Sequence, residues 1–217
     1  MVIASFLLNK LNLGVWPQVL RKPVTLGLIR RKNLATLPFK VRYHGYIYEG
    51  DAANLIDYNV LSRGSFEEGL TTLLIEWSKT YGSGIFLDVG ANVGVHTLGV
   101  HDHYKKVFAL EPYPPVASRL RRSLEINRIN NVNLIEAALA EASGESFFKV
   151  PNQSNLGTGK IALHGESALA RECVRVRVLT GDRILSAETL PLSAVKIDTE
   201  GAELRVLAGL AESLKRD

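Results

Sequence analysis

The sequence is poor in sulfur: it has one cysteine, Cys173, and one methionine, Met1. A lone cysteine cannot form an internal disulfide or a cysteine-based zinc site. No run of about 18 apolar residues occurs, so no segment is predicted to span a membrane. The apolar start at residues 1–8 has no basic segment before it and no clear small-residue cleavage site after it, which argues against a signal peptide. These absences predict a protein of the reducing cytoplasm.

The composition is that of a globular protein. Hydrophobic residues make up 46% of the 217 residues and charged residues 22%, which excludes disordered and collagen-like classes. The length suits one domain with or without an appendage. Charge is distributed unevenly, because residues 1–50 carry a net charge of +7 and the remainder −3. The basic N-terminal segment therefore needs an explanation of its own.

That segment mixes apolar clusters with basic residues, and Pro17, Pro23 and Pro38 divide it into short pieces. It can pack on the domain as a solvated cap, which we favour, or lie against an anionic membrane surface or an acidic partner. We therefore divide the chain into a basic leader, residues 1–45, and a domain, residues 46–217.

Local patterns predict the first elements of that domain. Residues 41–50 alternate as a strand or hairpin does. Ser65 and Glu68 form a capping box at the start of a predicted helix, which should end at Gly82. Helical spacing predicts that its apolar residues face the core: Phe66, Leu70, Leu73, Leu74 and Trp77.

From residue 85 onward, predicted strands alternate with predicted helices. The strands are 85–89, 107–110, 132–135 and 194–198, and the helices are 95–104, 114–127 and 203–214. Residues 145–180 are β-rich. In the last helix, Leu204, Leu207, Leu210 and Leu214 should face inward. Alternation of this kind predicts a parallel, doubly wound sheet, whose ligands bind at the carboxyl ends of the strands.

The most informative motif is the glycine-containing turn of residues 86–94. Its Gly90 and Gly94 are spaced G-x-x-x-G, unlike the G-x-G-x-x-G turn that binds pyrophosphate. Asp88 precedes the turn, where a carboxylate suits a cation and repels a pyrophosphate. Glu111 ends the next strand, where it can accept hydrogen bonds from two ribose hydroxyls. A ligand with a ribose and a positive charge but no phosphate fits S-adenosylmethionine.

Several blocks of the sequence, in matching order and spacing, resemble the FkbM family of S-adenosylmethionine-dependent methyltransferases. The resemblance covers roughly residues 45–215, and one departure is Gly181, where family members usually carry leucine. The block KIDTEGAE is its most specific part. The blocks are IDYNVLSRGSFEEG (56–69), FLDVGANVGVHTL (86–98), ALEP (109–112), NVNLIEAALA (131–140), VRVLTGDRIL (176–185) and KIDTEGAE (196–203).

The resemblance implies an O-methyltransferase with a Rossmann-like, seven-stranded class I methyltransferase fold. Its acceptor would be a hydroxyl of a small metabolite, a sugar or a glycolipid component. Carried over by position, the cofactor loop would contain Asp88, Gly90, Asn92 and Gly94, with Glu111 on the ribose and Ala138 by the adenine. Asp198 and Glu200 would face the methyl group and the substrate.

An alcohol acceptor gains from a general base within hydrogen-bond reach. The candidates are Asp198, Glu200 and His96, and Asp198 is our first choice because it stands at a strand tip. His96 is better interpreted as a helix-face residue. Glu200 and Glu203 can instead hold N–H groups of their loop. The His101–His103 segment resembles a metal-binding H-x-H pair, but helical residues i and i+2 diverge, so we predict a solvated helix end and no metal.

A seven-stranded sheet needs three strands more than the four core strands found here, for which we expect the order 3-2-1-4. We therefore expect a fragment, a shortened reading frame, or a partner that covers the apolar edge strand 194–198. The alternative functions are a non-catalytic or cofactor-binding remnant and, less favoured, a nicotinamide-dependent oxidoreductase. A nucleic-acid methyltransferase is disfavoured because Asp198-Thr-Glu200 stands where such enzymes have an N-P-P-Y-type tetrad.

Overall fold

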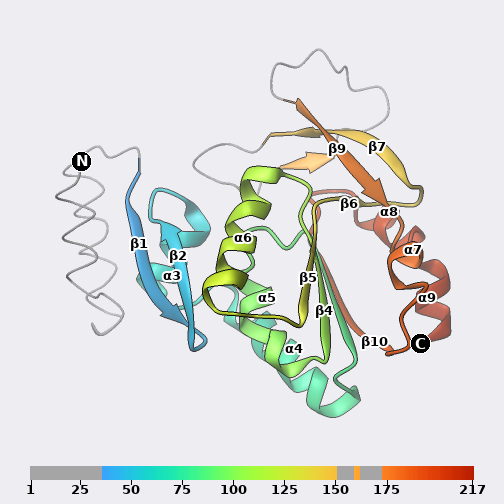
Figure 1. Cartoon of the computed structure of the whole chain (residues 1–217), viewed down its shortest axis with the longest axis horizontal. Helices are drawn as coiled ribbons and strands as arrows, with labels where there is room; N and C mark the ends of the chain where they lie inside the picture. The colour runs from blue at the N-terminus through green and yellow to red at the C-terminus, as the bar shows by residue number, and fades with distance from the viewer. Residues whose placement is uncertain (1–35, 151–158, 162–172) are drawn as a thin grey trace. The chain divides into compact units, whose positions relative to one another are not determined.

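The computed structural model describes residues 36–150, 159–161 and 173–217, so most of the predicted leader lies outside the described residues (Figure 1). The chain forms two compact units. The described part of the first is residues 36–68, and the second contains the remaining described residues.

The first unit contains an antiparallel hairpin and a helix: β1 (Pro38–Tyr43), β2 (Tyr46–Asp51) and α3 (Leu55–Arg63). His44 and Gly45 both have positive φ, which suits a two-residue hairpin turn. Asn54 caps the start of α3 by accepting a hydrogen bond from the Ile56 N–H. The predicted hairpin is confirmed, whereas α3 was not predicted.

The second unit is built on a parallel sheet, which confirms the predicted strand order. Its strands are, in spatial order, β10 (Leu192–Ile197), β3 (Ile85–Val89), β4 (Lys106–Leu110) and β5 (Val132–Ile135). Every residue of β3 is buried, as expected of a parallel strand covered on both faces. Among the described strands, β10 lies at one edge of the sheet and β5 at the other.

Helices cover both faces of this sheet, as a doubly wound fold requires (Figure 1). One face carries α4 (Glu68–Tyr81), α5 (Val95–Val100), the 3₁₀ helix η2 (His101–His103) and α6 (Pro114–Ile126); the other carries α7 (Gly181–Leu185), α8 (Glu203–Ala208) and α9 (Ala211–Arg216). Phe86 and Leu120 pack in the first interface. Leu87, Leu185 and Val206 pack in the second. No described helix is both long and apolar enough to cross a membrane.

A smaller sheet accounts for the β-rich segment. Its strands are, in spatial order, β6 (Ala138–Leu139), β9 (Cys173–Leu179), β7 (Gly144–Lys149) and β8 (Lys160–Ile161). Along β9, Val176 and Val178 are buried, whereas Arg175 and Arg177 are exposed. The buried side of the sheet packs against Ala202.

Two predictions about α4 are wrong. The helix begins at Glu68, after Glu67 in a left-handed conformation with φ 47°, so Ser65 does not cap it. Leu74 is buried as predicted, but Leu73 and Trp77 are 57% and 42% exposed. Apolar residues at helical spacing share one face of a helix, but that face is buried only where another element covers it.

The C-terminal helix also differs from its prediction, because it divides into α8 and α9 around Gly209. The backbone there is tightly packed: a Cβ on Gly209 would lie 2.1 Å from the Ala140 carbonyl oxygen. Leu210 is buried as predicted. The other leucines predicted to face inward are exposed: Leu204, Leu207 and Leu214.

Candidate functional site

Three acidic residues gather at the carboxyl ends of neighbouring strands. Asp88 is the penultimate residue of β3, Glu111 follows β4, and Asp198 follows β10. Since these strands are parallel and adjacent, their carboxyl ends lie side by side at the same end of the sheet. The sequence therefore correctly predicted that the carboxyl ends of the strands carry the acids and the 90–94 turn.

The turn after β3 is held in an unusual backbone conformation. Gly90, Asn92 and Gly94 all have positive φ, at 77°, 53° and 85°. A Cβ on Gly90 would lie 1.9 Å from the Asp198 carbonyl oxygen, and a Cβ on Gly94 would lie 2.3 Å from Leu120 Cδ1. The two glycines are thus required for left-handed backbone and for close packing of the turn against β10 and α6.

Glu111 supports the turn from the β4 side. Its buried carboxylate accepts hydrogen bonds from the Asn92 N–H (3.1 Å) and the Tyr113 N–H (2.9 Å). Burial raises the pKa of Glu111 to about 7, an effect that these two bonds oppose. Each carboxylate oxygen keeps a second lone pair, so Glu111 can still accept a hydrogen bond from a ligand hydroxyl.

Asp88 contacts two polar side chains of the protein. Its fully buried carboxylate accepts a hydrogen bond from the Thr97 hydroxyl (2.7 Å) and lies 3.2 Å from the Lys196 ammonium. The cation expected beside Asp88 is therefore supplied by the chain. Sequence reasoning missed Lys196, although a lysine inside an apolar strand such as 194–197 is a signal, because lysine is rarely buried without a partner.

Three acids follow β10: Asp198 and Glu200 are accessible, and Glu203 has a structural role. The Asp198 side chain is 62% exposed, with one carboxylate oxygen 3.7 Å from the Lys196 ammonium. Glu200 is exposed and has a φ of 55°. Glu203 accepts hydrogen bonds from the Gly201 N–H (3.0 Å) and the Thr199 N–H (3.1 Å), and the Gly201 bond is the main cause that holds the pKa of Glu203 below its usual value. Glu203 therefore holds N–H groups of its loop, a role that the sequence analysis allowed for it.

The histidines contact other elements of the fold. His96 is buried in α5, with Nδ1 3.3 Å from the Thr71 hydroxyl of α4. His101 is also buried, which lowers its pKa, and its Nδ1 lies 3.1 Å from Asn131 Oδ1. The predicted solvated helix end is therefore wrong for His101, although Asp102 is exposed. Within the described part of the chain, no group of three or more His, Cys, Asp or Glu is placed to hold a metal ion.

Ala138, predicted to lie by an adenine, is a buried residue of β6. It belongs to the apolar cluster that joins the smaller sheet to Ala202. The Tyr113 ring, two residues after Glu111, stacks on Phe148 of the same cluster at a centroid distance of 5.9 Å. An apolar wall thus stands next to the acidic strand ends.

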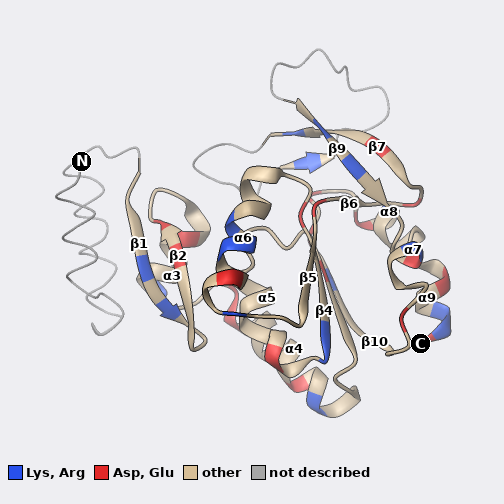
Figure 2. Cartoon of the chain, in the orientation of Figure 1, with Lys and Arg blue, Asp and Glu red and all other residues tan. Residues whose placement is uncertain are grey.

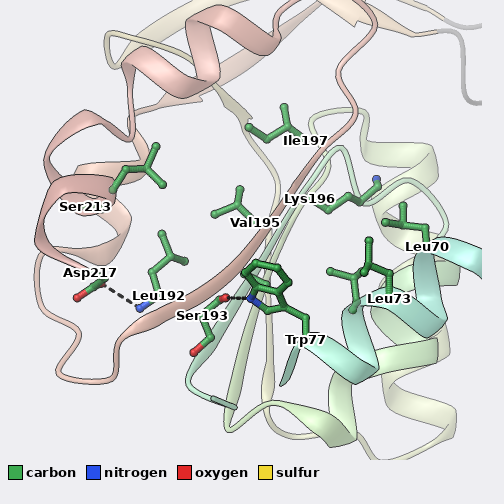
Figure 3. Close-up of a pocket in the computed structure, with 13 residues that line it drawn as sticks. Leu70, Leu73, Trp77, Leu192, Ser193, Val195, Lys196, Ile197, Ser213 and Asp217 are labelled. Carbon is green, nitrogen blue, oxygen red and sulfur yellow. Dashed lines mark hydrogen bonds between the residues drawn. The ribbon is translucent and has the colours of Figure 1, made fainter. Parts of the chain in front are cut away.

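A groove of about 570 Å³ follows the outer edge of β10 (Figure 3). Its lining includes the exposed Leu73 and Trp77 of α4 and Leu214 of α9. The Trp77 indole N–H donates to the Ser193 carbonyl, and Asp217 accepts from the Leu192 N–H, so side chains satisfy part of this edge (Figure 3). The groove is mostly apolar and reaches the acidic strand ends at Lys196 and Ile197.

Comparison with known proteins identifies the domain. The sequence profile of the methyltransferase FkbM domain matches residues 88–217. The chain is 27% identical over 150 residues to the hexuronic acid methyltransferase AglP of Haloferax volcanii, a match that covers 69% of this chain. The matched region spans 58% of the length of that relative.

Solved structures overlap with smaller parts of the chain. TYW2 of M. jannaschii, solved in complex with AdoMet, is 19% identical over 45% of this chain and 42% of its own, with a TM-score of 0.34. Trm5b of Pyrococcus abyssi is 19% identical over 49% of this chain and 32% of its own, with a TM-score of 0.36. A SAM-dependent methyltransferase of Agrobacterium tumefaciens is 12% identical over 46% of this chain and 32% of its own, with a TM-score of 0.37.

Proposed function

Because the chain belongs to the FkbM methyltransferase family, we propose that it uses S-adenosylmethionine to methylate a hydroxyl of a saccharide or another small metabolite. The observation that carries the proposal is the charge at the strand ends. Lys196 neutralises the buried Asp88, which leaves Glu111 and the exposed Asp198 as the acids that a ligand can meet. Such a surface suits a sulfonium cation and repels the pyrophosphate of a nicotinamide cofactor.

The residues that would hold the cofactor fit its chemistry. The backbone of the 90–94 turn would lie beside it, Glu111 would accept hydrogen bonds from the ribose hydroxyls, and the wall around Ala138 would contact the adenine. Asn92 positions the turn through its N–H bond to Glu111. S-adenosylmethionine supplies an activated methyl group as a sulfonium, so the protein chiefly has to align the acceptor.

Asp198 would accept the proton of the acceptor hydroxyl. It is exposed at the strand tip, where an acceptor can reach it, and it lies 3.7 Å from the Lys196 ammonium. Glu200, also exposed, stands two residues further on as the alternative base. His96 is buried and contacts Thr71, an arrangement that supports a positioning role better than direct proton transfer.

The acceptor class is supported by two observations. The relative AglP is a hexuronic acid methyltransferase, and a hexuronic acid is a sugar with a carboxylate. The exposed side of the smaller sheet carries Arg175, Arg177, Lys149 and Lys160 (Figure 2). Arg175 pairs with Glu145 of the same side, and the excess of basic residues that is left suits an acidic saccharide.

We further propose that the methyltransferase domain is residues 46–217 and that residues 1–45 are an appended leader. Of the first unit, β2 and α3 would then belong to the domain, whereas β1 would belong to the leader. The cytoplasmic location, the absence of a nucleic-acid partner and the contact of the leader with membranes stay predictions.

Calorimetry with S-adenosylhomocysteine and with NAD tests the proposal. We expect S-adenosylhomocysteine to bind and NAD not to bind; the reverse would favour the oxidoreductase. Methyl transfer from radiolabelled S-adenosylmethionine to uronic acids then separates an enzyme from a cofactor-binding remnant, which would bind without transfer. In an active preparation, Asp198→Asn should spare S-adenosylhomocysteine affinity and reduce turnover by about 100-fold. Unchanged turnover would exclude Asp198 as the base.

A further inference from the structure

Lys196 is a buried cation that has no direct role in the proposed reaction. It lies in β10 opposite Asp88 of β3 in the strand register, and only 8% of its surface is exposed. A lysine is expensive to bury unless its ammonium is fully used by acceptors.

The ammonium reaches three separate parts of the candidate site. It donates to the Gly90 carbonyl at 2.9 Å, lies 3.2 Å from an Asp88 carboxylate oxygen and lies 3.7 Å from one of Asp198. Of these three contacts, the Gly90 carbonyl accepts a hydrogen bond, and the two carboxylates lie within ion-pair distance. One side chain thus connects β3, the turn that follows it and the acid at the tip of β10.

The turn is consequently held from two sides. Lys196 binds its first carbonyl, at Gly90, while Glu111 accepts the N–H of Asn92. Gly90 also packs directly against the Asp198 backbone, where no space remains for a Cβ. A change at Lys196 would therefore reach both the turn and Asp198.

We propose that Lys196 is a positioning residue of the methyltransferase site, which fixes the 90–94 turn relative to Asp198. The proposal rests on the proposed function, in which the turn lies beside the cofactor and Asp198 is the base. The competing role is purely structural: Lys196 would only neutralise the buried Asp88. The two roles differ in one respect, because neutralisation becomes unnecessary once Asp88 carries no charge.

The test is therefore Lys196→Met in an Asp88→Asn background. Asparagine keeps an acceptor for the Thr97 hydroxyl, and methionine fills much of the lysine volume without charge. Asp88→Asn alone measures the cost of losing the carboxylate, and the effect of Lys196→Met is read against that variant. If the methionine variant does not fold, Lys196→Leu, which also lacks a donor, replaces it with the same expectations.

Two measurements report on the 90–94 turn. Hydrogen exchange of peptides covering 88–98 needs no ligand, and calorimetry measures affinity for S-adenosylhomocysteine. In the Asp88→Asn background, we expect Lys196→Met to speed exchange in these peptides and to weaken binding by about tenfold or more. If it changes neither the exchange nor the affinity, Lys196 only neutralises Asp88 and the proposal is overturned.

A matched control uses another lysine of the same sheet. Lys106, at the start of β4, pairs with Glu188 at 2.6 Å, away from the turn. The variant Lys106→Met/Glu188→Gln should leave both the hydrogen exchange of peptides covering 88–98 and the affinity for S-adenosylhomocysteine unchanged. If it changes them as much as Lys196→Met does, loss of any such pair loosens the turn and Lys196 has no special role. Failure of the wild type to bind S-adenosylhomocysteine would count against the proposed function, while the exchange readout would still judge Lys196.

Discussion

Glu111 offers a quantitative test of how burial controls charge at the strand ends. In the folded protein its carboxyl is buried, and its pKa is raised from 4.5 to about 7. In the unfolded chain it returns to 4.5. Glu111→Gln removes the titration and keeps a side chain of nearly the same size, with one oxygen left to accept an N–H bond.

The sign and the magnitude follow from proton linkage. Between pH 4.5 and 7 the folded carboxyl binds a proton that the unfolded one has lost, so this group contributes less to stability as the pH rises. A pKa shift of this size corresponds to a loss of about 3 kcal/mol in the free energy of unfolding. The loss is complete once the pH exceeds the pKa of Glu111 in the folded protein. Below pH 4.5 the contribution is fully present; above pH 7 it is lost.

Urea unfolding of wild type and Glu111→Gln at pH 4.5, 5.5, 6.5 and 8 measures the effect, because the titration of all other groups cancels in the difference. We expect the stability of the wild type relative to the variant to fall by about 3 kcal/mol across this series. The exposed Glu76, paired with Lys79 on α4, gives a control variant, Glu76→Gln, for which no comparable fall is expected. A constant difference for Glu111→Gln would refute the claim that burial raises the pKa of this carboxyl.

The remaining predictions concern the loops around the turn. Gly90→Ala should destabilise the protein by at least about 2 kcal/mol in urea unfolding, because its φ is positive and its Cβ would clash with the Asp198 carbonyl. Gly201→Ala, at positive φ but with open space around it, should cost only about 1 kcal/mol; equal costs would contradict the packing argument. Glu203→Gln should cost about 1 kcal/mol at pH 7, because it weakens the bonds to the Thr199 and Gly201 N–H groups. That cost should shrink as the pH falls through the lowered pKa of Glu203, and a cost independent of pH would argue against it.

The core strands were predictable because their signal is local. Each parallel strand is covered on both faces, so it reads as a short apolar run between polar loops. The predicted strands 85–89 and 132–135 match β3 and β5 residue for residue, and β4 and β10 differ by no more than two residues at each end. The strand order also follows, because a right-handed crossover leaves few topologies for such an alternation.

The faces of the helices were predicted less well. Leu73, Trp77, Leu204 and Leu214 repeat at helical spacing and were expected to face the core, but they are exposed. Periodicity shows that a helix has an apolar side, whereas burial depends on which element lies opposite. Among the described elements, no strand continues the sheet beyond β10, so Leu73 and Trp77 border a groove.

The sequence by itself determined the fold class, the family and the end of the sheet where the chemistry is expected. It could do so because strand periodicity and the motifs around Asp88, Glu111 and Asp198 each lie within a short segment of the chain. Only the tertiary structure decided how these acids are used. It buried Asp88 against Lys196 and raised the pKa of Glu111, while Asp198 stayed exposed. The physical reason is that desolvation and charge pairing depend on neighbours that lie far apart in the chain, 108 positions in the case of Asp88 and Lys196.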